Sequence, residues 1–147
     1  MNDSIRVERK DKRVEVNDQG DYIILPFGDQ AFVPALLNMM NDFEAHVEQH
    51  RKRVEELASL PDDNAEKVAD MVQINLDVCS VLAAGVDRIF GDGSCVKIFG
   101  VNVPSLFAFA DFFDQLAPII RAFSDKEAAA RVKRVRKYSE KYQKREV

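Results

Sequence analysis

The sequence predicts a mainly α-helical fold with a small N-terminal β-hairpin (α+β), in which a helical hairpin is followed by two further helices. Two long stretches, 34–60 and 63–90, carry apolar residues at helical spacing. A third apolar stretch starts after Pro104 and is rich in phenylalanine. Ahead of all three, short β-type runs flank a turn that ends in glycine.

The composition is that of a folded globular protein. The chain has 147 residues, of which 46% are hydrophobic and 31% are charged, which is enough for one domain with its own core. We expect no membrane span, because no run of about 18 apolar residues occurs, and no signal peptide, because the N-terminus lacks an apolar core. Cys79 and Cys95 are expected to be free thiols in a reducing cytoplasm.

The N-terminal part is predicted to be flexible over residues 1–13 and to form a β-hairpin after that. Residues 14–16 and 22–25 are the β-type runs, and Asn-Asp-Gln-Gly at 17–20 is a typical turn. Ile5 and Val7 alternate with polar residues, which is compatible with a third strand. Because a lone two-stranded hairpin is marginally stable, it should lean on the helices or on another copy of the chain. The hairpin and the helices together are expected to form one domain over residues 14–130.

The first long helix is expected to begin near Pro34 and to end before Pro61. Its apolar residues lie alternately three and four apart, which predicts a seam that packs on a neighbouring helix. The seam comprises Val33, Leu36, Met40, Phe43, Val47, Val54 and Leu57. His50 fills the remaining seam position, with His46 one turn earlier. Two histidines without further ligands make a poor metal site, so we interpret His50 as a residue at the edge of the core.

The second helix is expected over residues 63–90, after a turn with good N-capping residues. It carries two apolar stripes, which predicts that its later half is covered on two sides. One stripe comprises Val68, Val72, Cys79, Leu82, Val86 and Ile89, and the other comprises Met71, Ile74, Val78 and Val81. Asn75 lies within the first stripe, where it either sets the register of packing or is peripheral and hydrated.

A structural corner is expected after the second helix, where residues 86–91 and 96–100 nearly repeat each other. The glycines of this segment suit positive φ, so that the backbone can stop a helix and turn sharply. The phenylalanines should be buried beneath the turn. The corner comprises Phe90, Gly91, Gly93, Phe99 and Gly100.

The third helix is expected to open at Pro104, and Pro118 is expected to end or kink it before the last helix. Five of the ten phenylalanines fall between residues 107 and 123. Such a stripe is compatible with a partner groove, although stripes at helical spacing more often belong to a core. The candidate partner-binding residues here are Phe107, Phe109, Phe112 and Phe113.

Residues 131–147 are predicted to form a basic, frayed helical tail. Residues 125–147 hold nine basic and four acidic residues, whereas residues 41–92 hold five basic and 12 acidic ones. The acidic middle and the basic tail could attract each other within or between subunits, or could simply be two solvated faces. Arg131, Arg134 and Lys137 are the candidate partner-binding residues of the tail. The tail has few aromatic residues and the whole chain is acidic, so nucleic-acid binding is not expected.

No motif predicts catalysis, a metal site or a cofactor. Cys95 lies in a glycine-bearing turn where it could be exposed, but both histidines belong to a distant helix and offer it no base. Residues 91–93 lack the Lys-Ser or Lys-Thr that follows a phosphate-binding loop, and residues 92–95 lack the alternating acids of an EF-hand. Asp111 and Asp114 lack the burial of an acid–base pair. We therefore expect a protein that is not an enzyme.

The order of these pieces resembles the small tail assembly chaperones of long-tailed (siphovirus-type) phages and Gram-positive prophages. The resemblance covers about residues 14–123, and its most specific part is Ile-Phe-Gly-Asp-Gly at 89–93 followed by Lys-Ile-Phe-Gly at 97–100. It implies a mainly helical fold, self-association, and binding to the tape measure protein, with the tail tube protein as a second partner. It also implies a place in the bacterial host cytoplasm, absence from the mature virion and no active site.

Other classes of function stay open on the sequence alone. One is a structural component of the virion or its connector. The others are a helical module associated with nucleic acid and an unrecognised enzyme. Neighbouring genes for tail tube and tape measure proteins would favour the chaperone.

Overall fold

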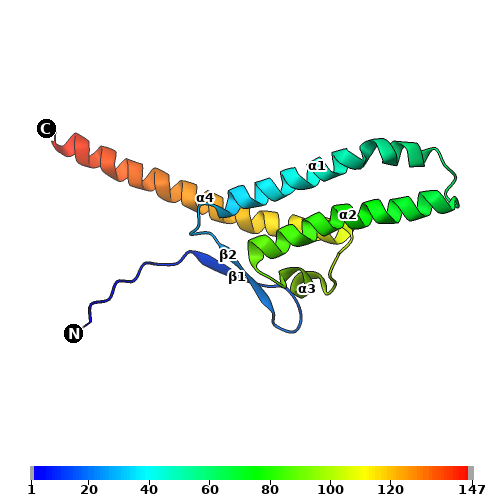
Figure 1. Cartoon of the computed structure of the whole chain (residues 1–147). Coiled ribbons are helices and arrows are strands. Elements are labelled where there is room, and N and C mark those ends of the chain that lie inside the picture. Colours follow the sequence, from blue (N-terminus) through cyan, green and yellow to red (C-terminus); the bar gives the residue numbers. More distant parts are fainter. Residues whose placement is uncertain (1, 146–147) are drawn as a thin grey trace. The chain divides into compact units, whose positions relative to one another are not determined.

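The chain forms two units, of which the first holds a β-hairpin, two long helices and a short helix (Figure 1). The computed structural model describes residues 2–145, and the side chains of residue 131 and residues 138–145 lie outside that description. The first unit spans Met1–Phe109 and the second spans Ala110–Val147. The fold is mainly α with one small antiparallel hairpin, as the sequence predicts.

Strands β1 (Asp11–Glu15) and β2 (Tyr22–Pro26) form the hairpin. β1 starts earlier than the predicted run at 14–16, because pairing with β2 draws three charged residues into the ladder despite their weak strand propensity. On β2, Ile23 and Leu25 are buried while Ile24 is exposed. This alternation is typical of a sheet with one face on the core.

The third strand that the alternation at Ile5 and Val7 allowed does not form. Residues 2–10 form no strand, and the side chains of Ile5 and Val7 are 92% and 82% exposed. A two-residue alternation is too short to hold a strand that has no buried face to cover.

Asn17 closes the hairpin turn and ties it to a helix far along the chain. Its side-chain oxygen accepts hydrogen bonds from the backbone N–H groups of Gln19 (3.0 Å) and Asp21 (3.1 Å). Its side-chain nitrogen donates to the Asp21 carboxylate (2.8 Å) and to the backbone carbonyl of Lys97 (3.0 Å). The hairpin therefore leans on the helices, as its marginal stability requires.

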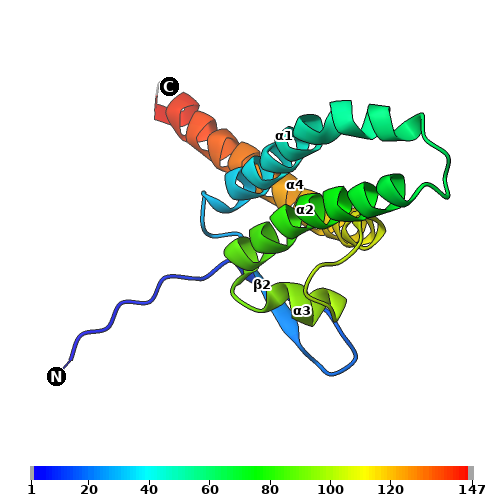
Figure 2. The ribbon, with the colours of Figure 1, turned by 45° about the vertical axis from the view of Figure 1, so that its right-hand side comes forward.

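Helices α1 (Phe32–Ala58) and α2 (Ala65–Phe90) form an antiparallel helical hairpin and lie side by side in both views (Figures 1 and 2). Buried aliphatic side chains from both helices fill the space between them. One cluster combines Leu57 with Ile74 and Val78, and Phe43 packs on it. Helical periodicity in the sequence thus predicts both long helices and their pairing.

The inner face of α1 is rotated slightly from the predicted seam. Phe32 and Met39 are buried, whereas their neighbours Val33 and Met40, which the seam prediction places inside, are exposed. Gly85 of α2 explains this choice, because a Cβ atom there would lie 2.7 Å from the sulfur of Met39. The glycine leaves room for Met39, and that contact sets the rotation of α1.

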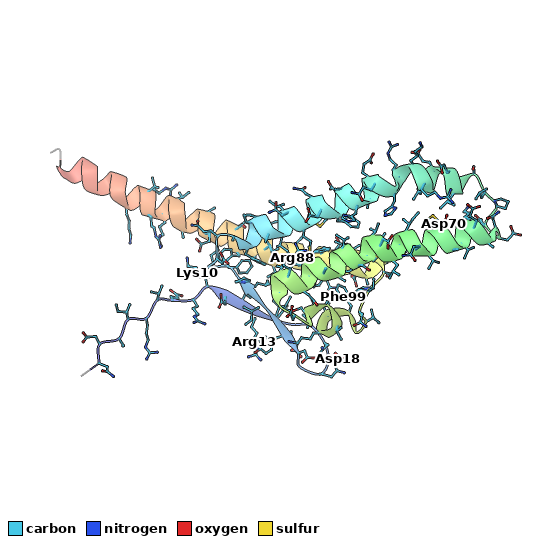
Figure 3. The ribbon with its side chains drawn as sticks, in the orientation of Figure 1. Lys10, Arg13, Asp18, Asp70, Arg88 and Phe99 are labelled. Atoms are coloured by element: carbon cyan, nitrogen blue, oxygen red, sulfur yellow. The ribbon has the colours of Figure 1, made fainter. Side chains whose placement is uncertain are left out.

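Polar contacts hold the tip of the helical hairpin, the loop end where Asp70 is labelled in Figure 3. The Arg53 guanidinium donates to Glu56 (3.3 Å) on its own helix and to Glu66 (2.8 Å) and Asp70 on α2. These carboxylates raise the pKa of Arg53, with the Asp70 hydrogen bond as the largest cause. The Nζ atom of Lys67 closes the loop by donating to the Leu60 carbonyl (3.1 Å).

The corner after α2 contains a short helix, α3 (Ser94–Phe99), that the sequence does not predict. Gly91, Gly93 and Gly100 adopt φ of 110°, 83° and 75°, as their residue type suggests. Two glycines lead the chain into α3 and the third ends it. Figures 1 and 2 both show α3 and the β-hairpin near the C-terminal end of α2.

The second unit is most of one long helix, α4 (Leu106–Arg145), whose first residues belong to the first unit. α4 runs through Pro118, so the prediction that two separate helices meet there is wrong in that respect. Proline in a helix interior removes one hydrogen bond and costs about 3 kcal/mol. The strong helix formers on both sides, with several full turns each, outweigh that local cost.

Candidate functional site

Reactive chemistry is not assembled in the part of the chain that the structure describes. No group of three or more His, Cys, Asp or Glu side chains there could hold a metal ion. Cys79 and Cys95 are both buried free cysteines, which corrects the expectation that Cys95 could be exposed. Cys95 is drawn inward because the formation of α3 turns its side chain from the loop surface into the core.

The surroundings of both thiols favour their protonated form over the thiolate. Burial raises the pKa of Cys79, against a smaller opposing effect of a hydrogen bond with the backbone of Leu106. Burial also raises the pKa of Cys95, and the negative charge of Asp87 adds to the rise. Because the thiolate is the nucleophile, these environments disfavour covalent catalysis.

The histidines lie along α1 without a constellation around them. His46 and His50 are half-buried, and the Nδ1 atom of His46 lies 3.1 Å from the backbone carbonyl of Asp42. This is the position at the edge of the core that was expected for His50. Asn75 is exposed, so it does not set the register of α2 against α1.

The corner is fixed by Asp87, a residue of α2 that the sequence analysis does not single out. Its carboxylate accepts hydrogen bonds from the backbone N–H groups of Cys95 (2.8 Å) and Gly93 (3.3 Å). These are donors that the start of α3 leaves without a partner in its own helix. An acidic side chain also interacts favourably with the helix dipole there. The clue in the sequence is an aspartate one turn before a glycine-rich break.

Aromatic rings pack edge to face at this corner. The ring centroids of Phe90 and Phe32 are 6.1 Å apart, and those of Phe99 and Phe109 are 5.0 Å apart. Phe109 is fully buried, but Phe90 and Phe99 are only half-buried. The prediction that Phe90 and Phe99 are buried is therefore too strong, because edge-to-face packing on a partner ring covers only part of each side chain.

Exposed apolar side chains are concentrated in residues 96–107, up to the start of α4, and we call this set the junction patch. The side chain of Phe107 is 89% exposed, which is unusual for so large an apolar residue. Further apolar side chains of the first unit are exposed in the same segment. The junction patch consists of Val96, Val101, Val103, Leu106 and Phe107.

The start of α4 determines which phenylalanine faces outward. The Ser105 hydroxyl accepts a hydrogen bond from the backbone N–H of Ala108 (3.3 Å), which fixes the first turn. Residues two apart on a helix point about 200° apart, so the burial of Phe109 forces Phe107 to solvent. The exposure of Phe107 is thus built into the fold.

The remaining candidate residues belong to the second unit. Phe112 and Phe113 are half-buried and pack on each other with ring centroids 5.4 Å apart. Arg134 and Lys137 are exposed, while the side chain of Arg131 lies outside the described residues. The two phenylalanines therefore behave as packed aromatic residues, and the two basic side chains are accessible to a partner.

α2 has an apolar character that goes beyond the needs of the helical hairpin. Among the described helices, α2 is long and apolar enough that it could cross a membrane. Core helices of soluble proteins also meet this criterion. The inner face of α2 packs on α1, but Val68, Val72 and Leu76 on its first half are exposed. We call these three residues the bare face of α2.

Comparison with known proteins gives one match. The family model described as a family of unknown function (DUF6673) matches residues 33–147. This range begins at the second residue of α1 and takes in all the helices. No curated protein and no solved structure matches the chain.

Proposed function

The chain belongs to the DUF6673 family, a family of unknown function, and we propose that it is a non-catalytic tail assembly chaperone of a long-tailed phage or prophage. In this proposal it self-associates in the bacterial host cytoplasm and binds the tape measure protein, with the tail tube protein as a second client. It leaves before the virion is mature. The resemblance of residues 14–123 to such chaperones motivates the client.

The junction patch is the observation that carries the proposal. Large exposed apolar surfaces on soluble proteins usually mark binding sites, and aromatic residues supply much of the binding energy at protein interfaces. Phe107 is the most exposed member of this patch, with 89% of its side chain open to solvent. A surface of this kind suits a client that presents apolar stripes along a long helix.

Repetition of a weak site would make such binding effective. A tape measure protein is a long helical chain with many similar stretches, and several chaperone copies can hold it at once. Linked binding events raise the overall affinity well above that of each contact. Self-association of the chaperone and binding of one long client therefore support each other.

The proposal is tested by co-expression of this chain with the tape measure protein that the proposal assigns as its client. We expect the client to stay soluble with the native chain and to aggregate with the variant Phe107→Ser. Loss of an aromatic hot spot should weaken binding by about tenfold or more. The matched control is Ile24→Ser, which removes an exposed apolar side chain from β2 and should leave the client soluble.

Two results would overturn the proposal. One is a client that behaves identically with the native chain, with Phe107→Ser and without any chaperone. The other is recovery of the chain from purified phage particles in amounts comparable to the tail tube protein. That second result would favour the structural component of the virion instead.

A further inference from the structure

The segment ahead of the β-hairpin leaves apolar side chains in solvent. Residues 2–8 form no strand and are exposed throughout, and Figures 1 and 2 both show them running away from the hairpin. The side chains of Ile5 and Val7 are 92% and 82% exposed. Two β-branched residues in alternation are typical of a strand that covers an apolar face. We call residues 2–8 the arm.

β1 has one edge that no other strand covers, because the sheet of the described residues contains only β1 and β2. The backbone N–H of Val16 donates to the Asp21 carbonyl (2.9 Å), in the same register as the strand pairs. Hydrogen-bonded pairs alternate along an antiparallel ladder, so the backbone groups of Arg13 and Glu15 point away from β2. Such an edge is a template for another strand. We call it the free edge of β1.

An antiparallel arrangement of the arm on this edge places apolar side chains opposite one another. With Val7 opposite Val14, Ile5 comes opposite Val16. Val14 lies opposite the buried Ile23 and, like Val16, is half-buried. Since opposite residues share a face of a sheet, Ile5 and Val7 join the face that the hairpin turns to the core.

The same register pairs opposite charges on the other face. Arg6 comes opposite Glu15, and Glu8 comes opposite Arg13. All four side chains are exposed, and none of the ion pairs found among the described residues involves them. Arg13 lies over the Tyr22 ring, 3.4 Å from its centroid, and this contact through the flat face does not use its N–H donors.

Charge also rejects the neighbouring registers. A slip by one residue places apolar side chains opposite charged ones. A slip by two residues restores the faces, but it brings Arg6 opposite Arg13 in one direction and Glu8 opposite Glu15 in the other. Like charges directly opposite each other are destabilising. One register therefore satisfies both faces of the strand.

The arm does not reach this position on its own β1. The hairpin that would bring the two together has Lys10 and Asp11 as its two-residue loop, and such loops require positive φ. Asp11 is instead the first residue of β1 and pairs with Pro26, and among the described residues only glycines adopt positive φ. The complement of the arm is thus presented by a second copy of the chain.

We propose that the arm of one copy adds to the free edge of β1 in a second copy as an antiparallel third strand, with residues 5–8 opposite residues 13–16. Its backbone hydrogen-bonds with Arg13 and Glu15, which gives affinity, and its alternating side chains fix the register. On one face of the arm the apolar side chains leave solvent, and on the other the charged side chains pair with those of β1.

The arm and the free edge are different surfaces, so the contact is head-to-tail. Each copy gives one arm and receives another, and association continues into a ring or an open chain of subunits. This inference rests on the self-association proposed above, and it adds the surface that carries it.

Charge reversal at one pair tests the register. In sedimentation velocity of the purified full-length chain, we expect native oligomers that grow with protein concentration. Arg6→Glu sets a like charge opposite Glu15 and should weaken association by about three- to tenfold. The control Lys52→Glu makes the same change of charge at an exposed position of α1 and should associate like the native chain.

A second reversal in the same chain should restore association. Glu15→Arg alone places a positive charge opposite Arg6 and should weaken association as Arg6→Glu does. The double variant with both changes again sets opposite charges against each other and should recover most of the lost affinity. Recovery requires that the two positions interact, because the effects of independent sites add. Circular dichroism establishes that each variant keeps the native helix content.

A disulfide trap detects the contact directly. Val7 and Val14 form a non-hydrogen-bonded pair in this register, where opposite side chains are closest and a disulfide fits. When Val7→Cys and Val14→Cys chains are mixed under mild oxidation, we expect a covalent dimer on a non-reducing gel. The native cysteines are buried and do not compete. The control mixes Ser4→Cys with Val14→Cys and should give little dimer, because position 4 is about 10 Å further along and on the other face.

The outcomes separate the inference from the function on which it rests. A native chain that stays monomeric at high micromolar concentration would overturn self-association and this inference together. Native oligomers that Arg6→Glu leaves unchanged, or that the double variant weakens further, would overturn only the inference, as would equal cross-linking of Ser4→Cys and Val7→Cys. If Val14→Cys loses the native helix content, Ile5→Cys mixed with Val16→Cys traps the same register.

Discussion

At the corner end of the α1–α2 hairpin, phenylalanine rings pack edge to face and one of them, Phe109, is fully buried. At the tip, one arginine links three carboxylates in solvent. The corner combines burial with hydrogen bonds that the short helix α3 cannot make for itself. The tip combines charged residues whose side chains remain well exposed; that of Arg53 is 38% exposed. Both ends join the same two helices, but by different physical means.

The difference teaches where the stability of this fold should reside. Removal of buried apolar surface costs several kcal/mol, because transfer and cavity terms add. Exposed ion pairs contribute little, since water and salt screen them and both side chains lose freedom. The corner should therefore determine the free energy of unfolding, while the tip should mainly determine how the loop between the helices is held.

The largest effect is expected at Phe109. Phe109→Ala should lower the free energy of unfolding by about 3–5 kcal/mol, because the ring is buried against Phe99. Urea unfolding followed by circular dichroism measures this. The matched control Phe107→Ala removes the same side chain from an exposed position and should change stability by less than about 0.5 kcal/mol. Equal losses in both variants would contradict the comparison.

A smaller loss is expected at Asp87. Asp87→Ala should cost about 1–3 kcal/mol, because the backbone N–H groups of Gly93 and Cys95 lose their acceptor. Alkylation of Cys95 in the folded variant should also accelerate as α3 opens. Asp77→Ala, which removes an exposed carboxylate from the same helix, serves as control. If thiol protection is unchanged in Asp87→Ala, α3 does not depend on this cap.

A still smaller effect is expected at Arg53. Arg53→Met keeps the aliphatic stem but removes the contacts with Glu56, Glu66 and Asp70. The melting temperature should fall slightly at low salt, and the difference should fade as salt rises. Lys52→Met, at the exposed neighbouring position, should show no such difference. A large fall in melting temperature that persists at high salt would show that the tip contributes as much stability as the corner.

The smallest effect is expected at Asp62, whose hydrogen bond with Lys67 lowers the pKa of its carboxyl group. A pKa that is lower in the folded state stabilises the fold above the ordinary carboxyl pKa of about 3.9, and this stabilisation is lost as the pH falls. The small difference between the native chain and Asp62→Asn should therefore be seen near neutral pH and vanish in acid. Urea unfolding at both pH values measures it. A difference that grows in acid would have the wrong sign.

Spacing of apolar residues along the sequence was sufficient for the long helices, because each helical contact repeats every three or four residues. The rotation of α1 escaped the same pattern, since Met39 and Met40 are equally apolar and only the space above Gly85 decides between them. The prediction of a helix end at Pro118 failed for a different reason. The local cost of the proline was outweighed by the length of helix on both sides of it.

The contacts that fix the corner could not be predicted from periodicity. Asp87 caps a helix that starts seven residues later, and Asn17 reaches a carbonyl 80 residues away. Such single hydrogen bonds leave no repeating trace in a sequence. The exposure of Phe107 depends on them too, because the position of α3 and the buried Phe109 determine which side of α4 turns outward.

The bond between Asn17 and the carbonyl of Lys97 also bears on the order of events during synthesis on the ribosome. The hairpin turn is made early, but its partner is added 80 residues later, which is roughly 4–16 s at about 5–20 residues translated per second. During that interval the nascent hairpin cannot form its hydrogen bond with α3, and the exposed backbone edges of its two strands can pair with other chains. Translation speed through this stretch, rather than final stability, thus sets how long the newly made chain is at risk of mispairing.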